Sequence, residues 1–570
     1  MLSPAPDALH TQPTDYRPCS GISRCRPPDD VTSVGLFDSG TLVGLGRPCS
    51  DSAVTRERES PRLEYLFGPR WSVGARRFRT SCARATASRF AIPGQAGEVS
   101  QSDPGYTILT TDKQQRNLMT ATAELAEFVS TTDFEDLPDD VVDRSKRALY
   151  NVLAVTLAGA TAPVGERVAA YVERQFPDDG PSVVVGHGRT SPVGAALANG
   201  TFPSVHHYDD TFDSLLVHPS ASSFPAAFAA GESVGTDGRR LLTGYVLGIE
   251  TTYHVGRSLD PGHAEQGWHS TGTMGTFGAA AASASVLGLT THEVRHTLGI
   301  VASGSSALRR NIGTNTNQLH TGHAAQVGLR AALLARDGFT ADDRIFDDEL
   351  SYGSVMTPST EYDPADVVES LGHDWGTLDI GFKPYPSASI SHGALAALLR
   401  IVVNEEISGD DVASVRVHLD PSLANVLDSR FPRDGSDAHA SIKYCLAIAL
   451  QDQRVEITDF TDERVEESAV RVQWEKISCD FRSPLGDGFE PKGARVVVYT
   501  NDGSEYSAEQ RTPPGSPDNP LTDDQLITKF GECASAAGSS IDAERALSIV
   551  TRLESRDMYD EFVRMIERFG

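Results

Sequence analysis

Histidine and aspartate side chains are concentrated in one short segment of the sequence. Six of them lie between positions 206 and 218: His206, His207, Asp209, Asp210, Asp213 and His218. Imidazole groups exchange protons close to neutral pH, and sites of chemistry gather titratable groups of this kind. The segment therefore indicates acid/base chemistry.

Two simpler interpretations of this segment remain open. Aspartate in a short polar segment often forms a turn or caps a helix, here the small-residue helix that we expect from about Phe224. His and Asp also suit zinc, iron or manganese, but the segment has no H-E-x-x-H motif, no regular histidine spacing on one helical face and no cysteine nearby. We therefore expect neither a metal nor another cofactor.

A second histidine lies directly ahead of a predicted helix. The segment Gly267-Trp268-His269-Ser270-Thr271-Gly272-Thr273 leads into small residues that predict a helix from about Thr273 to Leu289. A histidine beside the unpaired N–H groups of a helix N-terminus can hold and protonate a carboxylate. The alternative is a Ser/Thr cap with an incidental histidine.

Two further segments add polar groups. A polar turn, Gly313 to Gly322, contains Asn317 and His320 and precedes another predicted helix. Lys383 is one of only seven lysines and is followed by Pro384-Tyr385-Pro386, so its loop is rigid. A rigidly placed lysine suits anion binding, and a solvated lysine is the alternative.

The pattern of apolar residues predicts helices along most of the chain after residue 119. Patterns of helical period cover 120–129, 139–158, 165–176, 192–205, 239–257, 273–289, 292–300, 322–337, 523–536 and 542–569. Many of these segments are rich in Ala and Gly, which lets helices pack closely. The expected fold class is mainly α, with a large helical-bundle domain formed by both chain ends and an inserted smaller α+β domain.

A change of pattern near Leu371 marks this insertion. Strand patterns at 412–419, 470–474 and 494–499 alternate with helical patterns at 390–404 and 439–450. The predicted units are 119–372 for the first part of the helical domain, 373–514 for the α+β domain and 515–570 for the C-terminal return of the helical domain. A cleft between two such domains is a common place for a substrate.

Residues 1–118 differ from the rest. They are rich in Pro, Ser, Gly and Arg and show little periodicity, which predicts a disordered or over-extended N-terminal segment. We interpret Met119 as the working start. A targeting arm is the alternative, although the arginines form no amphipathic pattern.

The charge of the chain limits its partners and its setting. The net charge is −28, with seven lysines against 43 arginines, so the protein is expected to repel nucleic acid and anionic membranes. Such an acidic, lysine-poor surface suits high salt, and an ordinary acidic protein is the alternative. The seven cysteines form no disulfide framework and no apolar run is long enough to span a membrane, which predicts a cytoplasmic protein.

Taken in order, these segments resemble the MmgE/PrpD family, which includes 2-methylcitrate dehydratase and cis-aconitate decarboxylase. The resemblance extends from about Ala121 to the C-terminus. It depends on Asp209-Asp210-Thr211 with His218-Pro219, Gly267-Trp268-His269, the turn from Gly313-Thr314 to Gly322 with Ala324-Ala325, Gly338-Phe339-Thr340, Lys383-Pro384-Tyr385-Pro386 and Tyr444. It implies that the α+β domain is a lid and that the protein is a homodimer.

The resemblance also implies roles for the matching residues. The implied catalytic residues are His269, His218, Asp210, Asp209 and Tyr444, and the implied substrate-binding residues are Thr211, Lys383, Asn317 and His320. His269 is our first choice as proton carrier and His218 the second, with Asp210 orienting one of them. Thr211 and Lys383 would hold carboxylates.

The expected function is that of a metal-independent lyase acting on a small di- or tricarboxylate. Elimination of water, as by 2-methylcitrate dehydratase, is the first expectation. Decarboxylation or epimerisation of a related acid, or carboxylate binding without catalysis, are the alternatives. Two positions depart from the family pattern: Asn317 stands where the turn often has lysine, and His207 stands where an acid is usual. The missing cation bears on how many carboxylates the substrate carries.

Overall fold

The computed structural model describes residues 120–358, 362–425, 427, 430–482 and 484–569. Most of these residues are helical, which confirms the mainly α prediction. Our predictions for residues 1–118 lie outside the described residues. Within the described part, the buried hydrophobic side chains form two large groups, which we call the first core and the second core.

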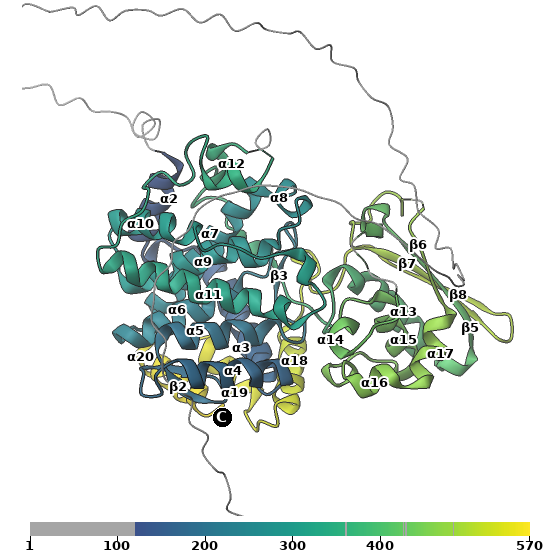
Figure 1. The fold of residues 1–570 in the computed structure, drawn as a ribbon. Helices are drawn as coiled ribbons and strands as arrows, with labels where there is room; N and C mark the ends of the chain where they lie inside the picture. Colours follow the sequence, from purple (N-terminus) through teal and green to yellow (C-terminus); the bar gives the residue numbers. More distant parts are fainter. Residues whose placement is uncertain (1–119, 359–361, 426, 428–429, 483, 570) are drawn as a thin grey trace, which may run out of the picture. The chain divides into compact units, whose positions relative to one another are not determined.

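The first core combines helices from the beginning and the end of the described chain (Figure 1). Its helices are α2 (Ala121–Thr131), α3 (Asp139–Ala160), α4 (Pro163–Gln175), α5 (Pro192–Thr201), α6 (Ser220–Val234), α7 (Gly238–Leu259), α9 (Ser270–Leu287), α10 (Thr291–Ala302), α11 (Asn315–Arg336), α18 (Asp523–Ala536), α19 (Ala543–Val550) and α20 (Arg556–Glu567). Helix α18 packs on α3, so the C-terminal segment returns to the helices that begin the described chain.

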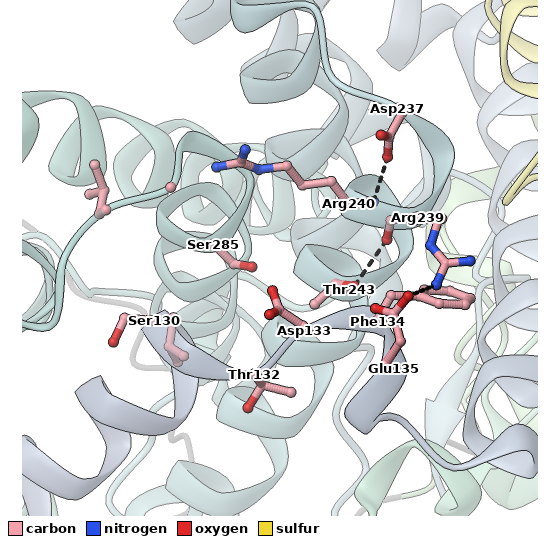
Figure 2. A pocket seen from close by; sticks show the side chains of 13 residues that line it. Ser130, Thr132, Asp133, Phe134, Glu135, Asp237, Arg239, Arg240, Thr243 and Ser285 are labelled. Carbon is pink, nitrogen blue, oxygen red and sulfur yellow. Dashed lines mark hydrogen bonds and ion pairs between the residues drawn. The ribbon is translucent and has the colours of Figure 1, made fainter. Parts of the chain in front are cut away.

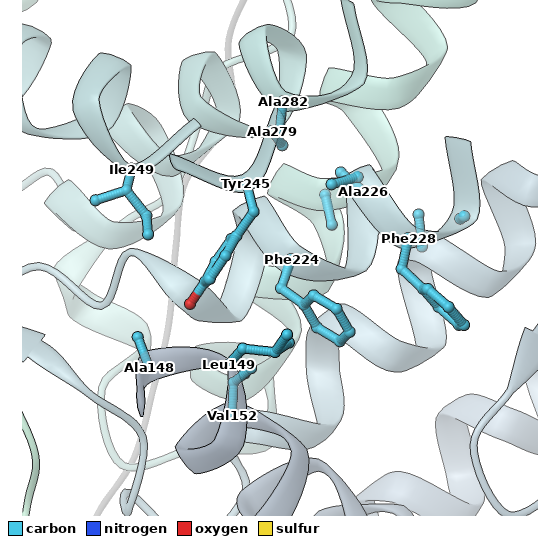
Figure 3. Packing of buried hydrophobic residues seen from close by; sticks show 14 of the residues in the cluster. Ala148, Leu149, Val152, Phe224, Ala226, Phe228, Tyr245, Ile249, Ala279 and Ala282 are labelled. Carbon is cyan, nitrogen blue, oxygen red and sulfur yellow. The ribbon is translucent and has the colours of Figure 1, made fainter. Parts of the chain in front are cut away.

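Helix α9 is the centre of the first core and is buried on all sides. Its sequence consists almost entirely of small residues, so α6, α7 and α11 all pack against it. A Cβ placed on Gly248 of α7 would lie 2.8 Å from the carbonyl oxygen of Gly278 in α9. Larger side chains fill the spaces beside this contact, among them Phe224 of α6 and Tyr245 of α7, whose ring centroids are 5.9 Å apart (Figure 3).

Helices α3 and α4 bear on the question of a membrane span. Among the described residues, no single helix is both long enough and apolar enough to cross a membrane. Helices α3 and α4 reach the required length and hydropathy only as a pair, and that pair is bent by 83°.

The second core is built from helices packed on a four-stranded sheet (Figure 1). The strand order is β6-β5-β7-β8, with β5 parallel to β6 and antiparallel to β7. The strands are β5 (Val412–Leu419), β6 (Ile477–Asp480), β7 (Ala494–Thr500) and β8 (Glu505–Gln510), and the main helices are α13 (His392–Asn404), α15 (Ile442–Asp452) and α17 (Ser468–Lys476). Alternate residues of β5 are buried, as expected for a sheet with one covered face.

One predicted strand is wrong. Residues 470–474 alternate apolar and polar, which suggested a strand, but they lie inside helix α17. The buried positions, Val470 and Gln473, are three residues apart, whereas Val472 is 51% exposed. Helical spacing therefore describes this segment, and strand β6 begins only at Ile477.

A short strand pairing positions the loop that carries Lys383. Strand β3 (Thr211–Phe212) pairs antiparallel with β4 (Ile380–Gly381), and Lys383 follows two residues later. The segment before β4 is fixed by Glu250 of α7, whose buried carboxylate accepts hydrogen bonds from the backbone N–H groups of residues 376 and 377 at 2.9 and 2.8 Å. The residues around 211 and 383 are thus held together although they are far apart in sequence.

The close packing of α11 on α9 generates a prediction. A Cβ on Gly328 would lie 2.5 Å from the Ala279 Cβ and 2.6 Å from the Ala280 nitrogen. We expect Gly328→Ala to lower the free energy of unfolding by about 1–3 kcal/mol through overpacking, although Ala is the better helix former by about 1 kcal/mol. Thermal and denaturant unfolding would measure the change.

The matched control is Gly531 of α18, where a Cβ would meet nothing within 4 Å. Because only helix propensity changes there, Gly531→Ala should raise the free energy of unfolding by about 0.5–1 kcal/mol. If both variants were stabilised, the tight contact between α9 and α11 would not be a packing constraint.

Candidate active site

A cavity of about 330 Å³ collects most of the residues predicted to perform chemistry. His269, His218, Asp209, Thr211, Lys383 and Asn317 all line it. The rest of the wall consists of Ser204, His207, Leu215, Leu216, Asp260, Ala264, Trp268, Ser270, Thr271, Arg309, Ile312, Thr321, Ala388, Ser389, Ile390 and Ala440. Ile390 belongs to the second core and Ala388 packs against it, so the cavity lies where the two cores meet.

A buried ion pair forms part of this wall. The Lys383 Nζ lies 3.1 Å from the Asp209 Oδ1 and donates a hydrogen bond to the His207 carbonyl oxygen at 3.0 Å. The two side chains are only 2% and 3% exposed. Burial by itself would raise the pKa of Asp209, but His218, Lys383 and His207 together lower it. The carboxylate is therefore ionised.

His218 is oriented by the backbone of Asp210. Its Nδ1 lies 2.7 Å from the Asp210 carbonyl oxygen, which can only accept, so the proton is on Nδ1 and Nε2 carries a lone pair. The Asp210 carboxylate does not line the cavity and instead accepts hydrogen bonds from the backbone N–H and the hydroxyl of Ser220. Burial raises the pKa of this carboxyl to about 7. Asp210 thus holds His218 through its main chain.

His269 is held at the start of α9 and touches a second histidine. Its backbone N–H donates to the Ala307 carbonyl oxygen at 3.0 Å, and its Nδ1 lies 3.0 Å from the Nδ1 of His320 in α11. His269 lines the cavity, whereas His320 does not. The structure therefore places His320 behind His269 and not in the wall that a substrate would contact.

Burial keeps the histidines of the cavity neutral. It lowers the pKa of His269 to about 3, with smaller contributions from His320 and His218. It also lowers the pKa of His207 to about 3, assisted by the charge of Lys383. The pKa of His218 is lowered by burial as well, against the opposing effect of the Asp209 carboxylate. Neutral imidazoles of this kind can accept a proton at one ring nitrogen and donate one from the other.

Lys529 is a residue of the site that the sequence analysis missed. It extends from α18, and its Nζ donates hydrogen bonds to the carbonyl oxygens of Tyr208 and Lys383, both at 2.8 Å. Burial lowers the pKa of Lys529 to about 8. This lysine ties together the two loops that carry the buried ion pair. The only signal in the sequence was that lysine is rare, with seven in the whole chain.

Arg309 is a second missed residue. It lines the cavity while its guanidinium donates to the Ala264 carbonyl oxygen at 3.0 Å. No motif surrounds it in the sequence, so only the fold identifies it as a cation at the cavity.

Three helices begin at the wall of the cavity. Helix α6 begins two residues after His218, α9 begins directly after His269, and Asn317 is the third residue of α11. The first N–H groups of a helix have no partner within the helix, and the helix dipole adds positive potential there. The arrangement therefore favours a bound anion such as a carboxylate.

Tyr444 lies outside the cavity, contrary to its place in the predicted catalytic set. It is fully buried in the second core, where its hydroxyl donates to the Asp459 carbonyl oxygen at 2.7 Å. Its ring packs against Phe431 and Phe460. Tyr444 therefore stabilises the second core, and we give it no role in the chemistry.

A second cavity, of about 340 Å³, lies beside the beginning of α7 (Figure 2). Its wall contains no histidine and no buried charged side chain, and Arg239 pairs with Glu135 and lies over the Phe134 ring. Its carboxylates and arginines are therefore accessible to solvent, and it lacks the buried titratable groups of the first cavity. Among the residues that the structure describes, no group of three or more His, Cys, Asp or Glu side chains is placed to hold a metal ion.

Comparison with known proteins relates the chain to one family along most of its length. Residues 123–365 match the MmgE/PrpD N-terminal domain and residues 385–555 match the MmgE/PrpD C-terminal domain. The cis-aconitate decarboxylase-like protein oryM of Aspergillus oryzae is 29% identical over 474 residues, covering 78% of this chain and 97% of that protein. Cis-aconitate decarboxylase of Aspergillus terreus is 26% identical over 475 residues, covering 78% and 95%. The 2-methylcitrate dehydratase of Salmonella typhimurium is 23% identical over 265 residues, covering 40% and 50%.

The buried ion pair generates a stability prediction. Lys383→Met leaves the Asp209 carboxylate buried without its cation, and breaking a buried pair from one side costs about 3–5 kcal/mol. We expect a loss of that order in the free energy of unfolding, together with a raised pKa of Asp209. Denaturant unfolding of the wild type, both single variants and the double variant would measure it.

The double variant Lys383→Met/Asp209→Leu is the control for this prediction. Because it removes both charges, it should recover much of the stability that the single variant loses. A Lys383→Met protein as stable as the wild type would mean that the two side chains are not a charged buried pair.

Proposed function

The chain belongs to the MmgE/PrpD family, and from this premise we propose that it is a lyase that decarboxylates a small unsaturated polycarboxylate of the cis-aconitate type. The observation that supports this most is the extent of the similarity. The alignments with the two cis-aconitate decarboxylase relatives cover 97% and 95% of those proteins. The alignment with 2-methylcitrate dehydratase covers half of that protein.

This order reverses the one drawn from the sequence, in which dehydration came first. The motifs that carried the resemblance point to the family as a whole, which includes both kinds of enzyme, so they could not separate the two reactions. Dehydration of a hydroxy acid remains the second candidate. It is favoured by the geometry of His218, whose Nε2 carries a lone pair and could remove a proton next to a carboxylate.

Decarboxylation of such an acid has simple requirements. In cis-aconitate a CH2 group next to a carbon–carbon double bond carries one carboxylate. When the bond between this CH2 and its carboxylate breaks, the electron pair enters the double-bond system, and the carboxylate on the far carbon of that system delocalises it. A proton then joins the far carbon of the original double bond, which shifts by one position. One proton is consumed and one carbon dioxide is released, so the site must supply an acid and stabilise a developing anion.

The wall of the cavity offers different surroundings to different carboxylates. Leu215, Leu216, Ile312 and Ile390 are the large apolar residues of the wall, and Leu216 and Ile312 are 45% and 44% exposed. We propose that one carboxylate packs against these side chains and loses part of its hydration, a loss that is relieved when the group leaves as uncharged carbon dioxide. The hydroxyl groups of Thr211, Ser270 and Thr271 and the ammonium group of Lys383, which is paired with Asp209, also line the wall. We propose that these groups, with the N-terminus of α9, hold the carboxylates that remain.

His269 is the proposed proton donor. It lines the cavity directly beside the N-terminus of α9, where a carboxylate would be held. Its Nδ1 is engaged with His320, so its Nε2 is the ring nitrogen available to a substrate. His218 is the second candidate, but the hydrogen bond to the Asp210 carbonyl oxygen requires the proton on its Nδ1. We therefore propose His269 as the acid.

A substrate panel tests the proposed reaction. The purified full-length chain would be assayed with cis-aconitate, 2-methylcitrate, citrate and isocitrate, with and without a chelator, by carbon dioxide release and by absorbance of a conjugated double bond. With cis-aconitate as substrate, we expect release of carbon dioxide and consumption of one proton from the solution. A conjugated product from 2-methylcitrate without carbon dioxide would instead establish dehydration. Thermal stabilisation by one of these acids without any turnover would point to a binding protein.

Replacement of His269 tests the assigned proton donor. His269→Gln keeps a polar side chain but cannot exchange protons, so we expect kcat to fall by about 100- to 10,000-fold, the usual contribution of a general acid. Substrate should still raise Tm, because the groups that hold carboxylates are unchanged. His296→Gln is the matched control: this half-buried histidine of α10 is outside the cavity and should leave kcat unchanged. Near-normal turnover by His269→Gln would disprove the assignment.

A further inference from the structure

The contact between His269 and His320 constrains where protons can lie. The two Nδ1 atoms are 3.0 Å apart, and the rings are inclined by 44° with centroids 5.1 Å apart. A hydrogen bond between two ring nitrogens needs one donor and one acceptor. Both imidazoles are buried and their pKa values are lowered, chiefly by burial, so both are neutral. A single proton therefore lies between the Nδ1 of His269 and the Nδ1 of His320.

Because the two rings share one proton between their Nδ1 atoms, one of the two Nε2 atoms is protonated and the other is bare. A neutral imidazole carries one proton, so the ring that donates from Nδ1 has a bare Nε2, and the ring that accepts at Nδ1 has a protonated Nε2. If His320 donates, His269 presents an Nε2–H to the cavity and is an acid. If His269 donates, it presents a lone pair and is a base. The direction of one hydrogen bond thus sets which role His269 can play.

The positions of the two rings give them different surroundings. His269 lines the cavity, whereas His320 belongs to α11 and lies outside the wall. Close packing of α9 on α11 makes the contact possible: a Cβ on Gly272, in the first turn of α9, would lie 3.1 Å from the His320 Cβ. Among the described residues, neither Nε2 has a hydrogen-bond partner in the protein. Each is therefore available, one toward the cavity and the other on the far side of the pair.

We propose that His320 is a positioning residue that sets the tautomer of His269 and passes it the proton used in each turnover. The inference rests on the proposed function, in which His269 protonates a carbon atom. When the His269 Nε2–H goes to the substrate, the His269 Nδ1 takes the proton from the His320 Nδ1. His320 then takes a replacement proton from solvent at its own Nε2. These transfers leave both tautomers reversed. After product release, the His269 Nε2 takes a proton from solvent that enters the cavity, the shared proton returns to the His320 Nδ1, and the His320 Nε2 releases its proton to solvent. Each turnover then consumes one proton, and the starting tautomers are restored.

Replacement of His320 by asparagine separates this role from a structural one. An asparagine amide can reproduce a hydrogen bond at the place of Nδ1 but cannot carry a proton through to a second nitrogen. We expect His320→Asn to keep KM and the substrate-induced rise in Tm, and to lower kcat by about 100-fold. The matched control is His296→Asn in α10, a half-buried histidine outside the cavity, which should change neither constant. A His320→Asn protein within about threefold of wild-type kcat would overturn the proposal.

A measurement without substrate keeps this test independent of the reaction. In the full-length chain with ¹⁵N-labelled histidine, the ring-nitrogen shifts report which nitrogen carries the proton. We expect His269 and His320 to be neutral at pH 7 and to show opposite tautomers, with His269 protonated at Nε2, and the His269 tautomer to lose its bias in His320→Ala. Identical tautomers, or two rings that titrate independently near pH 6.5, would overturn the proposal. Inactivity on the whole substrate panel with opposite tautomers present would count against the proposed reaction and not against the paired histidines.

Discussion

The buried ion pair between Asp209 and Lys383 is the interaction on which the site depends. Neither charge can be left alone at 2–3% exposure, so the two loops that carry them must meet. Other contacts hold the two loops together. Strand β3 pairs with β4, and the Lys383 Nζ donates to the His207 carbonyl oxygen. Lys529 donates to one carbonyl oxygen on each loop, those of Tyr208 and Lys383. Because Lys529 comes from α18, the C-terminal return of the chain helps to close the site.

The burial that requires this pair also determines the state of the histidines. A low-dielectric wall disfavours a charged imidazole, so His269, His207 and His218 are neutral although an ionised aspartate lies among them. Positive potential for an anionic ligand then has to come from groups that do not titrate near neutral pH. The N-termini of α6, α9 and α11 provide it at the wall of the cavity. A helix N-terminus is a suitable partner because its N–H groups remain donors whatever the pH.

The sequence predicted the parts of the molecule that depend on local patterns. The bounds of β5 and α18 were predicted without error, and His269, His218, Asp209 and Lys383 were predicted from motifs and were found at one cavity. Other features depend on tertiary contacts. Residues 470–474 alternate like a strand yet pack by helical spacing, so that prediction failed. Tyr444 lies in a motif, and the structure places its side chain in the second core and not at the cavity. Lys529 and Arg309 have no local signature, because only the return of α18 and the packing of the loop at 309 bring them to the site.

The charges of the wall bear on the decarboxylation that we propose. Lys383 is neutralised by Asp209, and Asn317 adds an uncharged amide. Arg309 is the remaining cation among the described lining residues, and the wall also contains the carboxyl group of Asp260. A tricarboxylate with three negative charges would therefore be incompletely compensated, with one carboxylate against the apolar side chains. Dehydration leaves the charge of such a ligand unchanged, so it would not relieve this imbalance. Decarboxylation removes a carboxylate and takes up a proton, so the product carries one negative charge fewer. We therefore expect a wall poor in cations to favour the proposed decarboxylation over dehydration.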